Sequence, residues 1–190
     1  MTRIQFDREQ VIRDVTRLFW QQGFGGASMQ MVVKATGLKP GSLYLAFGSK
    51  EGLYQAALEH YARQSQATLC QTLEQATSIG EGICRQLLRM VEESGKVDYC
   101  SCFLVKSQLE LAASGGDLQH SVSTYLTEIE SLYADYLGGI YPPGQARQYA
   151  ASLMLHIFGI RVYGYLGHER DLIVAAVKAG LSWLPWADCD

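Results

Sequence analysis

The side chains best suited to contact another molecule gather around residue 40. Lys39, Ser42 and Tyr44 supply an ammonium group and two hydroxyls within a short stretch. Such groups can donate hydrogen bonds to DNA phosphates or to base edges in the major groove. Gly41 has no side chain, so it could let a nucleic-acid backbone approach closely, or it could serve packing alone. The alternative for Lys39 and Ser42 is a solvated helix face.

A second candidate for chemistry is Cys102, within Cys100-Ser101-Cys102-Phe103-Leu104-Val105-Lys106. A cysteine near a helix N-terminus, with Lys106 one turn later, has surroundings that favour a reactive thiolate. The alternative is a small buried apolar residue. Because the cysteines number five and no secretion signal is visible, we expect no disulfide framework. No Cys-x-x-Cys pair occurs and the histidines are scattered, so we expect no metal site and no cofactor.

The elements that position the first group form a helix-turn-helix unit. Ser28 can cap a short helix over residues 29–35, which Gly37 ends. Pro40 then lies in the first turn of a two-turn helix over residues 40–47. Two short helices joined by a turn containing glycine suit DNA, because the second helix can present its N-terminal residues to the major groove.

Helices on both sides complete this domain. Asp7 can cap a first helix, and Gln10 lies three residues later, as in a capping box. Gly23 ends that helix near Phe24. After Gly48-Ser49, a longer helix begins at Lys50 and continues to about residue 75.

The charge distribution favours an anionic partner for this end of the chain. The whole chain of 190 residues has a formal net charge of −3. Residues 1–60 carry seven Lys or Arg and five Asp or Glu, a net of +2, which leaves −5 for residues 61–190. A composition of 48% hydrophobic and 18% charged residues is typical of a globular protein with a core. No apolar stretch approaches the ~18 residues of a spanning helix, so we expect a cytoplasmic protein without a membrane partner.

The N-terminal region resembles the DNA-binding domain of the TetR/AcrR family of transcriptional regulators over about residues 8–55. The resemblance rests on Ser28-x3-Val32-x4-Gly37-Leu38-Lys39-Pro40-Gly41-Ser42-Leu43-Tyr44-x2-Phe47-x-Ser49-Lys50-Glu51-x-Leu53. It implies an all-helical homodimer that binds a palindromic operator, usually represses, and releases DNA when a small molecule enters the C-terminal domain.

The resemblance also assigns residues to DNA contact. Ser28 and Lys50 match the family's phosphate-contact positions, although Ser28 could be only a helix cap. Ala46 departs from the family, which often has His or Tyr there, so one phosphate contact is in doubt. Leu45 and Ala46 could instead meet a thymine methyl. The predicted DNA-binding residues are Ser28, Lys39, Pro40, Gly41, Ser42, Tyr44 and Lys50.

The C-terminal two-thirds carries no motif of comparable strength. Helical segments are predicted at about 80–94, 101–113, 117–138, 144–165 and 169–184. The resemblance favours the last two as the dimer interface. The alternative is that their apolar residues form an intramolecular core. These residues are Tyr149, Leu153, Ile157, Ile160, Gly164, Leu172, Ile173, Ala176, Val177, Gly180, Leu181 and Leu184.

Aromatic residues crowd the same region and could line an apolar cavity for a small apolar or aromatic inducer. The candidate pocket residues are Cys102, Phe103, Tyr125, Tyr133, Phe158 and Tyr163. Cys102 offers an alternative, because some members of one branch of the family sense oxidants or electrophiles through this cysteine.

Together these observations predict an all-α protein with two domains. Residues 1–50 form a three-helix helix-turn-helix domain, and residues 51–190 form a larger ligand-binding and dimerisation domain, joined by the helix over about 50–75. An enzyme is not expected, because no phosphate loop or nucleophile elbow occurs and Cys102 has no evident histidine partner. A helical adaptor that binds protein rather than DNA is the remaining alternative.

Overall fold

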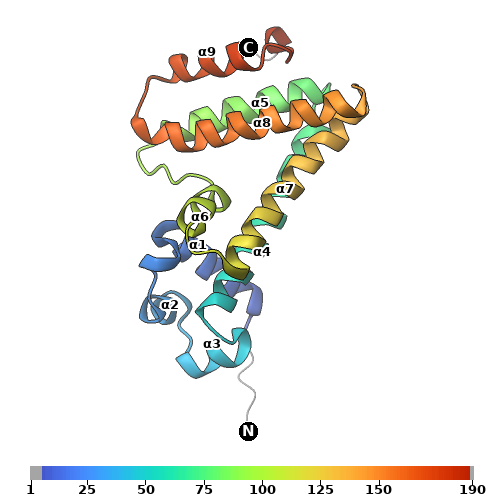
Figure 1. Ribbon diagram of the computed structural model, residues 1–190. Helices are drawn as coiled ribbons and strands as arrows, with labels where there is room; N and C mark the ends of the chain where they lie inside the picture. The colour runs from blue at the N-terminus through green and yellow to red at the C-terminus, as the bar shows by residue number, and fades with distance from the viewer. Residues whose placement is uncertain (1–5, 189–190) are drawn as a thin grey trace. The chain divides into compact units, whose positions relative to one another are not determined.

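The computed structural model describes residues 6–188, and over that range it contains helices and no strands (Figure 1). Two short 3-10 helices accompany the α-helices. The elements in order are α1 (Arg8–Gly26), α2 (Met29–Thr36), α3 (Pro40–Phe47), α4 (Lys50–Glu74), α5 (Ile79–Ser94), α6 (Phe103–Leu111), α7 (Gly116–Gly138), α8 (Pro143–Tyr163), η1 (Gly164–Leu166), α9 (Arg170–Gly180) and η2 (Trp186–Asp188). The all-α prediction is confirmed. Among the described residues, no helix has the length and apolar character needed to cross a membrane.

The chain divides into two compact units, and the division does not follow the order of the sequence. The first unit comprises Met1–Gln64, of which residues 1–5 are not described, together with Phe103–Tyr125. The second comprises Ser65–Cys102 and Leu126–Asp190. The first unit therefore holds α6 and the start of α7 in addition to the helices that the sequence assigned to the N-terminal domain.

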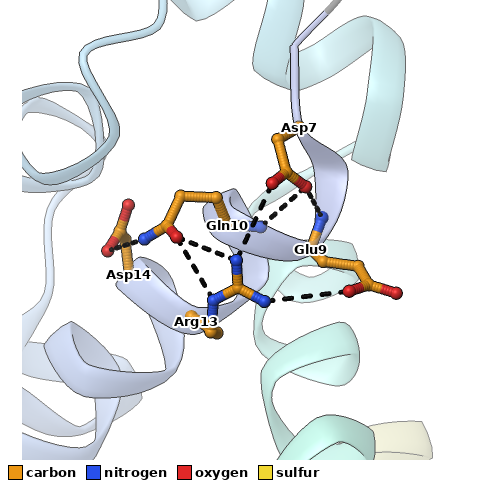
Figure 2. Close-up of polar contacts among 5 residues, drawn as sticks. All are labelled: Asp7, Glu9, Gln10, Arg13 and Asp14. Atoms are coloured by element: carbon orange, nitrogen blue, oxygen red, sulfur yellow. Dashed lines mark hydrogen bonds and ion pairs between the residues drawn. The ribbon is translucent and has the colours of Figure 1, made fainter.

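The start of α1 follows the predicted cap and departs from the predicted capping box (Figure 2). The Asp7 carboxylate accepts hydrogen bonds from the backbone amides of Glu9, at 3.0 Å, and Gln10, at 3.1 Å. The Gln10 side chain turns the other way, donating to Asp14 and accepting from Arg13. The capping-box prediction for Gln10 is therefore wrong, because these two helical neighbours take up both ends of its amide.

Local signals set the boundaries of α2, α3 and α4. The Ser28 hydroxyl accepts a hydrogen bond from the Met31 amide at 3.2 Å. Gly37 ends α2 at a φ of 68°, a left-handed conformation that favours glycine. Pro40 is the first residue of α3, where its missing N–H costs nothing. Ser49 precedes α4 and accepts from the Gly52 amide.

Aromatic rings form the centre of the first unit. Tyr54 of α4 is fully buried and makes edge-to-face contacts with Phe19 and Phe24 of α1 and with Phe103 of α6. Tyr61 packs in the same way against Phe103. Aromatic pairs in this geometry stabilise a core beyond their buried area. Phe103 therefore joins α6 to α4.

The second unit contains α5, α8 and α9. Ser78 caps α5, and the buried Glu81 accepts hydrogen bonds from the Thr77 amide and hydroxyl. These hydrogen bonds lower the pKa of Glu81. The ring of Tyr149 on α8 stacks parallel to the ring of Trp183, which follows α9, and their centroids are 3.9 Å apart. The helix predicted over 169–184 is shorter than expected, since α9 ends at Gly180.

Most of the apolar residues offered as dimer contacts lie inside the second unit. They form its core, as the alternative interpretation predicted, because their helices pack against α5 and each other. The buried set is Leu153, Ile157, Ile160, Gly164, Ile173, Val177, Leu181 and Leu184. Other apolar side chains of α8 and α9 remain exposed, and the largest are Leu155 at 74% and Leu172 at 56%.

Candidate DNA-binding site

Helix α3 packs one face against the rest of the first unit and exposes another. Leu43 is fully buried and holds the helix against the rest of the first unit. Lys39 stands immediately before the helix, where its carbonyl accepts hydrogen bonds from the amides of Ser42 and Leu43. The side chains of Lys39, Ser42 and Tyr44 make no hydrogen bond or ion pair within residues 6–188. All three groups predicted to meet DNA are thus available to an external partner.

The outward face of α3 also carries an apolar side chain. Leu45 is 91% exposed and Tyr44 is 47% exposed, while the neighbouring Ala46 is half-buried. An exposed leucine next to hydrogen-bond donors suits a surface that reads base edges, because a thymine methyl is an apolar feature of the major groove.

Gly41 stands in open space near the start of α3. A Cβ atom built on it would meet no described atom within 4 Å. Packing inside the chain therefore does not require glycine here. Close approach of an outside molecule, the other interpretation open from the sequence, stays a prediction.

Ser28 and Lys50 have partners of their own. The exposed Ser28 hydroxyl caps α2, yet a hydroxyl that accepts one hydrogen bond can still donate another. The Lys50 ammonium lies 4.5 Å from the centre of the Phe24 ring, in a cation–π contact. Next to it, a hydrogen bond from the Ser49 side chain lowers the pKa of Glu51. The phosphate contacts of Ser28 and Lys50 stay predictions.

Cys102 lies directly before α6 and is half-buried. Its predicted place at a helix N-terminus is confirmed. Lys106, expected beside the thiol, donates a hydrogen bond from its ammonium to the Trp20 carbonyl at 2.6 Å. No disulfide joins Cys70, Cys84, Cys100 and Cys102 to one another; the fifth cysteine, Cys189, lies outside the described residues.

The residues proposed for an inducer pocket belong to different surroundings. Phe103 and Tyr125 are in the first unit, where Tyr125 accepts a hydrogen bond from Gln55 at 3.0 Å. Tyr133 is buried in the second unit and donates to Gln86 at 2.7 Å. Phe158 is half-buried in the second unit. Tyr163 is 45% exposed and stacks on His168. A common pocket for these residues stays a prediction.

Polar residues of α6 that the sequence did not single out support the first unit. Ser107 and Tyr54 share a hydrogen bond of 2.6 Å, and burial raises the pKa of Tyr54 to about 12. The Glu110 carboxylate accepts from the backbone amides of Phe24 and Gly25. No local pattern marks these residues, because their partners are distant in the sequence. By contrast, Ser78-x-x-Glu81 is a visible capping signature that the sequence interpretation omitted.

Known proteins with similar sequences are bacterial regulators. Residues 13–57 match the family described as "Bacterial regulatory proteins, tetR family". The HTH-type transcriptional repressor BdcR of Escherichia coli (strain K12) is 28% identical over 179 residues, covering 93% of this chain and 88% of BdcR. The HTH-type transcriptional repressor ComR of the same strain is 27% identical over 121 residues. That match covers 63% of this chain and 58% of ComR, so the chain spans less than two thirds of ComR.

Solved structures agree. A cysteine-substituted mutant of the TetR family transcriptional regulator CifR, in complex with 26-base-pair operator DNA, is similar with a TM-score of 0.79 and 26% identity. The similarity covers 97% of this chain and 100% of that one. The reduced form of NemR from E. coli, at 19% identity and a TM-score of 0.73 over 90% of this chain and 95% of NemR, shows the same fold. Family motif, helix-turn-helix geometry and relatives coincide: residues 13–57 form a DNA-binding domain of the TetR family, in a chain that resembles whole regulators of that family.

Proposed function

We propose that this regulator is a repressor, which binds a palindromic operator as a homodimer and leaves it when a small molecule binds. The observation that carries the proposal is the outward face of α3, where Lys39, Ser42 and Tyr44 lie without partners among the described residues. The repressors BdcR and ComR, and the operator complex of CifR, support the same assignment.

The residues of α3 then have distinct roles. Lys39 binds a phosphate or a base edge, Ser42 contacts a base edge and Tyr44 binds a phosphate. Pro40 fixes the first turn of the helix, and Gly41 admits the DNA backbone. Ser28 and Lys50 add phosphate contacts at the starts of α2 and α4. Phosphate contacts set the register on DNA, while base contacts set the sequence preference.

Dimerisation follows from a palindromic site, because two recognition helices must reach half-sites about 34 Å apart. We place the contact on the exposed faces of α8 and α9, in place of the buried residues expected from the sequence. Leu155, Gly159 and Val162 recur at helical spacing on α8. On α9 the exposed apolar residues are Leu172, Ala175, Ala176 and Ala179. The small residues allow close approach of a second copy.

The releasing signal is proposed to be a small apolar or aromatic molecule bound by the C-terminal part of the chain. A ligand releases DNA only if it binds the conformation that cannot bind DNA more tightly than the one that can. Oxidation or alkylation of Cys102 is the alternative signal. It is favoured by the position of Cys102 directly before α6 and by the replacement of cysteines in the CifR–operator structures.

DNA binding is tested with a duplex selected by the chain from a randomised library, compared with sheared heterogeneous DNA over a salt series. Affinity for both should fall as salt rises, and more steeply as more phosphates are contacted. Lys39→Ala should weaken binding about ten-fold and reduce the salt slope, whereas the exposed Lys96→Ala in the second unit should change little. A protein adaptor would select no duplex.

The interface is tested by sedimentation. Leu155→Glu should convert the dimer to a monomer and reduce operator affinity, because a charge would be buried against the second copy. Val97→Glu is a matched control, since Val97 is fully exposed outside the helices. A Leu155→Glu protein that stays dimeric would place the interface elsewhere.

The signal is tested on the assembled protein–operator complex. An electrophile such as N-ethylmaleimide should release the unsubstituted chain and leave Cys102→Ser bound, if Cys102 is the sensor. Equal release of both proteins would exclude Cys102, and a screen of aromatic ligands on the same complex would then test the small-molecule signal.

A further inference from the structure

Helix α1 is interrupted close to the helix-turn-helix unit. Gly23 has φ 74° and ψ 177°, a backbone conformation that belongs almost entirely to glycine. The helical ladder is therefore bent three residues before α1 ends, and the chain reaches the α2 cap, Ser28, only five residues after the bend. The conformation at Gly23 thus fixes the direction in which the chain enters α2.

Two side chains of α6 meet the backbone on either side of this bend. In an uninterrupted helix the Phe24 amide would donate to the Trp20 carbonyl. Here the Phe24 amide donates to Glu110 Oε2 at 2.9 Å, and the Trp20 carbonyl accepts from Lys106 Nζ at 2.6 Å. The Gly25 amide donates to the other Glu110 oxygen at 2.7 Å. A cation meets the carbonyl and an anion meets the amides, so each charge matches the polarity of its backbone partner.

Lys106 and Glu110 are one turn apart on α6, and neighbouring residues fix that helix. Phe103 packs on Tyr54 and Tyr61, and Ser107 hydrogen-bonds Tyr54. Helix α6 packs against α1, as Figure 1 shows, and every group in these contacts belongs to the first unit. The two charges are therefore presented to α1 from a rigid support.

We propose that Lys106 and Glu110 are positioning residues for operator binding, which hold the bend of α1 and so set the orientation of α2 and α3. This proposal rests on the proposed function, because the bend of α1 can affect operator binding only if the chain binds an operator. Glycine at position 23 is part of the arrangement, because a Cβ there would lie 2.8 Å from Glu110 Oε2.

The direction in which one substitution changes operator affinity separates this proposal from a simple charge effect. Glu110→Gln removes a negative charge, and charge alone would make binding to DNA the same or tighter. Loss of the carboxylate that holds Phe24 and Gly25 would instead weaken operator binding, by about ten-fold for hydrogen bonds to a charged group. Glu59→Gln is the matched control, because it removes one acidic charge from the same unit at a surface pair with Arg63.

The experiment uses the full chain with the selected duplex and with sheared heterogeneous DNA. Glu110→Gln should lose operator affinity while its affinity for sheared DNA stays equal or rises, a split that partial unfolding would not produce. Hydrogen exchange of the Phe24 and Gly25 amides should become about ten-fold faster. Lys106→Met should also lose operator affinity, and Lys106→Arg should restore most of it, since an arginine can still donate to the Trp20 carbonyl.

A double variant tests polarity directly. Lys106→Glu with Glu110→Lys keeps net charge and composition, yet it opposes each backbone group with the wrong charge. The operator affinity of this double variant should fall below that of Glu110→Gln and that of Lys106→Met. Unchanged operator affinity in Glu110→Gln, or in the double variant, would overturn the positioning role.

The experiment tests separately whether Glu110 holds the bend of α1 and whether that bend matters for operator binding. Unchanged amide exchange in Glu110→Gln would show that the carboxylate does not hold the bend. If the unsubstituted chain selects no duplex, the proposed function and the positioning role both fall, whereas the amide exchange still reports whether Glu110 holds α1.

Discussion

Helices α3 and α6 both belong to the first unit, and they use their polar side chains in opposite ways. The donors of α3 at Ser42 and Tyr44 have no partner among the described residues, and Leu45 is almost fully exposed. On α6, Lys106, Ser107 and Glu110 all bind α1 or α4. A DNA-binding unit needs both kinds of helix, because exposed donors read DNA only when other contacts hold their helix in place.

The comparison also explains two glycines. Gly23 is in a conformation that other residues rarely adopt, and Glu110 lies against it. Gly41 is in ordinary helical geometry, and no described atom lies within 4 Å of where its Cβ would be. The fold therefore requires one glycine and leaves room for a side chain at the other, where close approach of DNA is the proposed role.

The largest expected effect comes from Gly23→Ala. The side chain would be strained by the positive φ and would displace the Glu110 carboxylate from two amides. We expect a loss of about 2–3 kcal/mol in the free energy of unfolding, measured by urea denaturation.

Gly25→Ala provides the matched control. Its Cβ would lie 3.4 Å from Glu110 Oε1, an ordinary contact, and no positive φ is involved. We expect a change of less than about 1 kcal/mol. Equal destabilisation by the two substitutions would show that crowding near Glu110, and not the bend, is responsible.

A smaller effect is expected for Tyr54→Phe. The ring stays in the aromatic core, but the buried Ser107 hydroxyl loses its partner, which costs about 1–2 kcal/mol. Burial raises the pKa of Tyr54 from 10.0 to about 12, so the neutral tyrosine contributes stability below pH 10 that is lost as pH rises toward 12. Urea denaturation of the wild-type chain should show this alkaline loss, and the contribution should be absent from Tyr54→Phe.

Tyr44→Phe removes the same hydroxyl group from a tyrosine of α3. Because Tyr44 has no hydrogen-bond partner among the described residues, the free energy of unfolding should change by less than about 0.5 kcal/mol. Operator affinity should fall through the lost phosphate contact. A stability loss as large as that of Tyr54→Phe would contradict the assignment of Tyr44 to an outside partner.

Local chemistry explains why α2 and α3 could be predicted from the sequence. Ser28, Gly37 and Pro40 each act on the backbone within a few residues, so their types alone define helix ends. The same helix ends place Lys39, Ser42 and Tyr44 at the start of α3, where the sequence predicted DNA contacts. The packing of α6 into the first unit could not be predicted, because Glu110 and Gly25 are 85 residues apart and no periodic pattern connects them.

The proposed dimer surface illustrates a different limit of sequence reasoning. Helical spacing identifies an apolar face, but it does not say whether that face meets the same chain or a second copy. Leu153 and Ile157 belong to the intramolecular core, and Leu155 between them is exposed. Only the packing of α8 against its neighbours separates the two faces.

Gly41→Ala is expected to change stability with the opposite sign. An alanine in the first turn of α3 restricts the unfolded chain and meets no described atom, so the free energy of unfolding should rise by up to about 1 kcal/mol. The added methyl should nevertheless reduce operator affinity about ten-fold, because it would stand between the helix and the DNA backbone. Denaturation and binding to the selected duplex measure the two effects on one protein. A variant that gains stability and keeps its operator affinity would show that DNA does not approach α3 at Gly41. The proposed DNA-binding role of Gly41, which distinguishes it from Gly23, would then be wrong.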